Sequence, residues 1–248
     1  MSPVREGKSL RIALQSFFWL HPEWWTIGLA SVAWAFMLPH TGPNSGHNAH
    51  HRMTVVEEIG NWMLMVAAMM LPLVRDAVRF TASASLWARR HRAILGFLLG
   101  YFLPWLAVAI VAAMLRQADW THTDAAPALG FAAAALWQRT VMYRRAVLAC
   151  HRTWPIAPLG WRADRDCLSF GSFIGLSCVR TCWPLMLACG FAGHSLIAMT
   201  GGVVIGFVDE WRYRQHRRYP DPPISGPLAM AAYYGMLAAW KLVPALAA

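Results

Sequence analysis

The chain has 248 residues, of which 57% are hydrophobic and only 14% are charged. A soluble domain carries roughly 25% charged residues, so this composition excludes an ordinary soluble protein and a disordered chain. The net charge of +10 would suggest nucleic-acid binding in a soluble chain, but in so apolar a chain it indicates basic loops on one side of a bilayer. The sequence therefore predicts a polytopic membrane protein that binds no nucleic acid.

Apolar segments recur along the whole chain. A helix that crosses a bilayer needs about 20 mostly apolar residues. The segments predict an all-α transmembrane helix bundle with about seven spans, forming a single domain over residues 1–248. The predicted spans cover residues 24–39, 59–74, 94–115, 126–142, 169–191, 194–208 and 227–246.

Basic residues alternate between the loops that join these spans. When the N-terminus is placed in the cytoplasm, 18 of the 22 Lys and Arg residues lie on the cytoplasmic side. The remaining four are Arg52, Arg116, Arg180 and Lys241. This asymmetry follows the positive-inside rule. It predicts a multi-pass protein of the bacterial inner membrane with a periplasmic C-terminus.

Sulfur side chains gather on one face of the predicted fifth span. Cys178, Cys182 and Cys189 fall within about 40° of one another around a helix, and Met186 lies about 40° further round. Soft sulfur ligands suit Cu(I), or Zn together with nitrogen ligands. Because glycines share this face, close packing against another helix is the alternative explanation.

The second span and the loop before it offer further metal ligands. Met65 and Met69 lie on one face of the helix, although methionine also fills gaps in apolar cores. The preceding loop contains His47, His50 and His51, a composition typical of metal-binding tracts. We therefore predict a copper or zinc site drawn from these residues and from the sulfur face of the fifth span.

Arg180 stands near the middle of the predicted fifth span. A charged side chain at that depth costs about 2.5–3.5 kcal/mol on insertion scales. We expect Arg180 to face the bundle interior and to pair with Glu57 or Glu58, which stand at the outer mouth of the second span. The alternative is that the helix sits higher in the bilayer and the arginine extends to the interface.

Two helical motifs resemble those of the bacterial predicted metal-binding integral membrane proteins. Residues 62–72 read Trp-x-x-Met-x-x-x-Met-Met-Leu-Pro, which is similar to the family's Trp-x-x-Met…Ala-Met-Met-x-Pro segment. Residues 175–186 resemble its Gly-x-x-Cys-x-x-Cys-Cys-Trp-x-Leu-Met segment. The resemblance covers about residues 55–212, and it implies a membrane protein that binds metal.

The chain departs from the family pattern at several positions. Arg180 stands at a glycine position, and Thr181 stands where the family has the middle cysteine of its cluster. In a cytoplasmic stretch that matches more weakly, Val147 and His151 occupy the family's two cysteine positions, and Cys150 is displaced by one. These changes identify the chain as a diverged member that has lost some of the family's thiols.

The features above predict a metal-handling membrane protein, with copper preferred, that serves metal handling or metalloprotein assembly. The alternative is a non-catalytic accessory or assembly subunit of a larger membrane complex, which the 14 tryptophans favour. A membrane thiol oxidoreductase ranks last because a Cys-x-x-Cys motif is absent, and no nucleophile–base pair indicates an enzyme. The expected partners are the lipid bilayer, other membrane subunits and a periplasmic metal-carrying protein.

Overall fold

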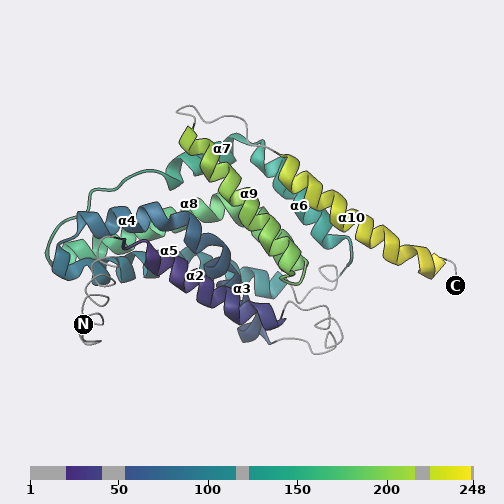
Figure 1. Ribbon diagram of the computed structural model, residues 1–248, viewed down its shortest axis with the longest axis horizontal. Helices are drawn as coiled ribbons and strands as arrows, with labels where there is room; N and C mark the ends of the chain where they lie inside the picture. The colour runs from purple at the N-terminus through teal and green to yellow at the C-terminus, as the bar shows by residue number, and fades with distance from the viewer. Residues whose placement is uncertain (1–20, 41–53, 116–122, 216–223, 247–248) are drawn as a thin grey trace, which may run out of the picture.

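The computed structural model describes residues 21–40, 54–115, 123–215 and 224–246. Within these ranges the regular structure is entirely helical, which confirms the all-α fold class (Figure 1). Short 3-10 turns cover Leu38–His40, Leu71–Val74 and Trp87–Arg89. The α-helices are α2 (Trp24–Met37), α3 (Val55–Met70), α4 (Arg75–Ala84), α5 (Arg90–Leu115), α6 (Ala126–Gln138), α7 (Val141–Cys150), α8 (Gly160–Phe191), α9 (Leu196–Gln215) and α10 (Ser225–Leu246).

Fewer helices than the seven predicted spans have the length and apolarity of a span. A helix is found at every predicted span, but in the described part of the chain only Trp87–Leu115 and Gly160–Phe191 are long and apolar enough to cross a membrane. The helices α2, with 14 residues, and α6, with 13, fall short of the roughly 20 residues that a span requires. The second half of α9 carries several charged side chains, which lower its hydropathy.

The centre of the fold is the pairing of α5 with α8. A Cβ atom built on Gly100 would lie 2.1 Å from the carbonyl oxygen of Leu168, and one built on Gly171 would lie 2.0 Å from that of Phe97. The two backbones are therefore in direct contact, which only glycine permits at these positions. A Cβ atom on Gly96 would meet Cys167, and one on Gly175 would meet Tyr101, so later residues of α5 contact later residues of α8 and the two helices run parallel.

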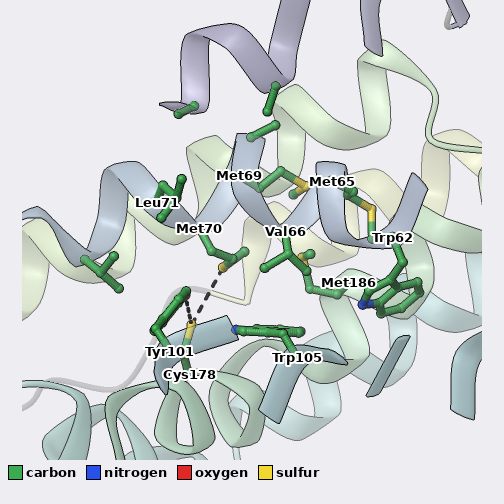
Figure 2. Close-up of a cluster of buried hydrophobic side chains, with 14 of the residues drawn as sticks. Trp62, Met65, Val66, Met69, Met70, Leu71, Tyr101, Trp105, Cys178 and Met186 are labelled. Atoms are coloured by element: carbon green, nitrogen blue, oxygen red, sulfur yellow. Dashed lines mark hydrogen bonds between the residues drawn. The ribbon is translucent and has the colours of Figure 1, made fainter. Parts of the chain in front are cut away.

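The remaining helices surround this pair. The helix α3 packs against α2 and α5, α7 packs against α8, and α9 packs against both α8 and α3. The helix α6 packs against α8, and α10 lies along α6 and projects to the right in Figure 1. Because α3 is covered on several sides, Met65, Met69 and Met70 are fully buried in the core (Figure 2).

Candidate metal site: a cysteine-lined cavity

A cavity of about 260 Å³ lies between α4, α7, α8 and α9. Its wall contains three of the five cysteines of the chain, Cys150, Cys178 and Cys182, and none of these is in a disulfide. The wall also includes Asp76 and His151, which are exposed. Both belong to segments rich in arginine, so the cavity opens toward the basic side of the molecule. We call it the cysteine cavity.

Cys178 has the most closely defined surroundings of the three thiols. Its Sγ accepts a hydrogen bond from the Tyr101 hydroxyl at 3.2 Å, and it lies 3.8 Å from the Sδ of Met70 (Figure 2). Cys182 stands one turn further along α8, on the same face of the helix, and it also lines the cavity. Two thiols of α8 therefore lie at the wall of the cavity, and the buried thioether of Met70 from α3 lies beside the thiol of Cys178.

Cys150 approaches the same wall from the last residue of α7. Its Sγ lies 3.7 Å from the Oγ1 of Thr181. Burial raises the pKa of the Cys150 thiol, so this group stays protonated near neutral pH. Thr181 stands where the resembling family has a cysteine, and a cysteine at that position would also face Cys150.

The structure separates the sulfur residues that the sequence grouped together. A Cβ atom on Gly202 of α9 would lie 2.5 Å from the Cε of Met69 and 3.2 Å from the Sγ of Cys189, so these two pack together away from the cavity wall. Met65 and Met186 are fully buried in the hydrophobic core (Figure 2). The thioether beside Cys178 belongs instead to Met70, which follows Met69 in the same motif.

The other predicted ligands lie outside the described residues. His47, His50 and His51 fall in the stretch 41–53, so the predicted histidine site remains a prediction. Within the described residues, no group of three or more His, Cys, Asp or Glu side chains is arranged to hold a metal ion. A metal in the cysteine cavity would therefore depend on two thiols and a thioether, a ligand set that suits Cu(I) better than zinc.

The prediction for Arg180 was wrong. Its side chain is exposed, because a step of two residues from Cys178 turns the helix by about 200° and places Arg180 on the opposite face of α8. Glu57 is also exposed, and its carboxylate accepts a hydrogen bond from the backbone N–H of Thr54 at 2.7 Å, in the capping box that begins α3. Glu58 is buried, whereas Arg180 is exposed.

Trp137 compensates for the proline inside α8. Pro184 has no N–H, so it leaves the backbone carbonyl of Arg180 without its helical hydrogen bond. The indole N–H of Trp137 donates to this carbonyl at 2.9 Å, and its ring packs edge-on against Trp183. A residue of α6 thus stabilises α8 two residues before Cys182.

A buried acid at the cavity was missed by the sequence analysis. Asp209 is only 9% exposed, and its Oδ2 accepts hydrogen bonds from the Tyr143 hydroxyl and, at 3.1 Å, from the Nε2 of Gln138. Burial raises the pKa of Asp209 to about 6. The only signal in the sequence is an acidic residue directly after the apolar run of the predicted sixth span.

An ion-pair bridge joins two helices at the polar end of the cavity. Arg214 of α9 pairs with Asp76 of α4 at 2.6 Å and with Glu210 of its own helix at 2.5 Å. Asp76 and Glu210 both belong to the wall of the cysteine cavity. The bridge therefore connects α4 to α9 where the cavity meets the exposed surface.

Comparison with known proteins agrees with a metal-related role. The model of the PpoB2 family, which is described as a copper chaperone, matches residues 59–234. The match includes every helix that lines the cysteine cavity. No curated protein and no solved structure matches the chain. Because the family match covers well over half of its length, the chain belongs to the PpoB2 copper chaperone family.

Proposed function

We propose that the protein is an integral membrane copper carrier that holds Cu(I) as its cargo at the wall of the cysteine cavity. Membership of a copper chaperone family supports the choice of metal. The observation that carries the proposal is that Cys178 and Cys182 stand one turn apart at the cavity wall, with the Met70 sulfur 3.8 Å from that of Cys178. Thiolate and thioether sulfur are the ligands that select Cu(I) over harder cations.

The cavity is suited to passing copper to a partner. Cys178 is buried, whereas Cys182 and Cys150 are only partly buried, so the ligands differ in their access from the cavity. Copper moves between carriers when an incoming thiol replaces one ligand at a time. The proposed partners are therefore other metal-handling proteins, or a membrane enzyme whose copper centre this protein helps to assemble.

The proposed location is the bacterial inner membrane, with α5 and α8 as spanning helices. Both helices begin among arginines and both meet the length and apolarity of a span. By the positive-inside rule their N-terminal ends lie in the cytoplasm. Since the exposed part of the cavity wall belongs to the same basic side, copper would exchange with the cytoplasm.

Copper binding by purified protein tests this function. We expect wild-type protein, purified in detergent under reducing conditions and loaded with Cu(I), to retain about one equivalent of copper after desalting. The double variant Cys178→Ala/Cys182→Ala should lose it, because two of the three proposed ligands are gone. Copper is measured by mass spectrometry, and folding is monitored by thermal unfolding.

Cys167→Ala is the matched control. Cys167 is buried in the same helix, but it packs near Gly96 of α5 and is not part of the cavity wall. This variant should bind copper as the wild type does. The proposed function fails if wild-type protein retains no copper, or if the double variant retains as much as the wild type.

A further inference from the structure

The Tyr101 hydroxyl is a buried polar group at the interface of α5 and α8. The residue is completely buried, and its hydroxyl donates to the Sγ of Cys178 at 3.2 Å. A hydroxyl without a hydrogen-bond partner in an apolar interior costs several kcal/mol, so buried hydroxyls normally have one. Here the acceptor is one of the two thiols proposed to hold copper.

The backbone of Tyr101 is held in place independently of this hydrogen bond. A Cβ atom on Gly175 would lie 2.4 Å from the carbonyl oxygen of Tyr101, so α8 contacts this residue one turn before Cys178. The Tyr101 ring also lies parallel to that of Phe97, with centroids 6.3 Å apart, and meets Phe102 edge-on at 5.6 Å. Packing therefore fixes the direction in which the hydroxyl points.

A second buried aromatic residue of α5 lies beside Cys178. Trp105 follows Tyr101 by one turn of α5 and is completely buried. In Figure 2 its indole lies beside Cys178, and its N–H has no hydrogen-bond partner among the described residues. Two aromatic residues of α5 thus border Cys178, and of these the Tyr101 hydroxyl donates to its sulfur.

We propose that Tyr101 is a positioning residue for the copper site: its hydroxyl anchors the Cys178 sulfur beside Met70 and leaves Cys182 as the ligand that exchanges. The inference rests on the proposed copper-carrying function. Hydrogen bonds from outer groups orient metal ligands, and removing such a group typically lowers metal affinity by 10- to 100-fold. Cys182 is less buried than Cys178, so an incoming thiol reaches it first.

The test compares Tyr101→Phe with the wild type. Phenylalanine keeps the ring and removes only the donor. We expect the Cu(I) affinity, measured by competition with a chromophoric chelator, to fall by about 10- to 100-fold. The ultraviolet absorption of the Cu(I)–thiolate complex should also shift, because one sulfur has lost its hydrogen bond.

Tyr234→Phe is the matched control. It removes a hydroxyl that is bonded to the Oγ of Ser195 at 2.6 Å and lies on α10, which does not contribute to the cavity wall. Its copper affinity and absorption should equal those of the wild type. If Tyr101→Phe is not recovered folded, 3-fluorotyrosine at position 101 keeps the hydroxyl, changes its donor strength, and should still shift the absorption.

The possible failures are distinguishable. Wild-type protein that binds no Cu(I) overturns the proposed function and this inference with it. Wild-type protein that binds Cu(I), together with unchanged affinity and absorption in Tyr101→Phe, overturns the positioning role alone. An equal loss in Tyr101→Phe and Tyr234→Phe also overturns it, because the effect would then be general to lost hydroxyl groups.

Discussion

The two carboxylate oxygens of Asp209 lie in different surroundings. Oδ2 accepts two hydrogen bonds, whereas Oδ1 is buried and has no partner among the described residues. An acid whose pKa is higher in the folded than in the unfolded chain binds more protons when folded, so stability falls as pH rises. For Asp209 this loss occurs between pH 3.8, its ordinary pKa, and its folded pKa of about 6.

We predict that Asp209→Asn stabilises the protein above pH 6. Asparagine keeps an oxygen that accepts from Tyr143, but it carries no charge to bury. The wild-type penalty at pH 7 is on the order of 3 kcal/mol, since a tenfold change in an equilibrium constant corresponds to about 1.4 kcal/mol. Thermal unfolding from pH 4 to 7.5 should show the two proteins diverging as pH rises. If the melting temperatures of the two proteins changed in parallel with pH, the raised pKa of Asp209 would be contradicted.

The residues of the candidate site were only partly predictable. Helical spacing placed Cys178 and Cys182 on one face, and the structure brings both to the cysteine cavity. Helical spacing could not separate these two cysteines from Cys189. Seven residues make nearly two full turns, so Cys189 returns to the same face of the helix at a different depth. Met70, Tyr101 and Asp209 approach from other helices, so their contacts depend on packing that no local pattern encodes.

At the scale of elements, the contact between α5 and α8 sets the position of the cavity wall. It brings Tyr101 against Gly175 and thereby against Cys178. The positions of the long apolar helices were predictable from hydrophobic runs. The helices α4 and α7 were not predictable from hydrophobic runs, because each has only 10 residues and carries arginines. The start of α8 at Gly160 was also missed, since its first turns are polar.

We predict that Gly171→Ala separates α5 from α8. The added Cβ would lie 2.0 Å from a backbone oxygen of Phe97, so a helix must move rather than a side chain. Overpacking of this kind typically costs 1–3 kcal/mol. The melting temperature in detergent should fall. Gly96→Ala is the control on the same interface, because its Cβ would meet Cys167 at an ordinary 3.5 Å and stability should change little.

At the scale of the molecule, the parallel arrangement of α5 and α8 constrains the path of the chain. Arg89 and Arg92 pair with Asp164 at 2.6 and 2.7 Å, so the N-terminal ends of the two helices are fastened together on the basic side. If both helices cross a bilayer outward, the chain must return between Leu115 and Gly160. The helix α6, at 13 residues and about 20 Å, is the apolar segment available for that return.

We predict that this return occurs, with residue 85 in the cytoplasm, residue 120 in the periplasm and residue 160 in the cytoplasm. Reporters active on only one side of the membrane, fused after each position, should alternate inside, outside, inside. The reason is the positive-inside rule, since arginines stand before α5 and again between α6 and α8 but are sparse after α5. A helix as short as α6 can cross where the bilayer thins around the protein. A cytoplasmic reporter after residue 120 would instead mean that α5 does not span, and that its apolar surface is covered by other protein.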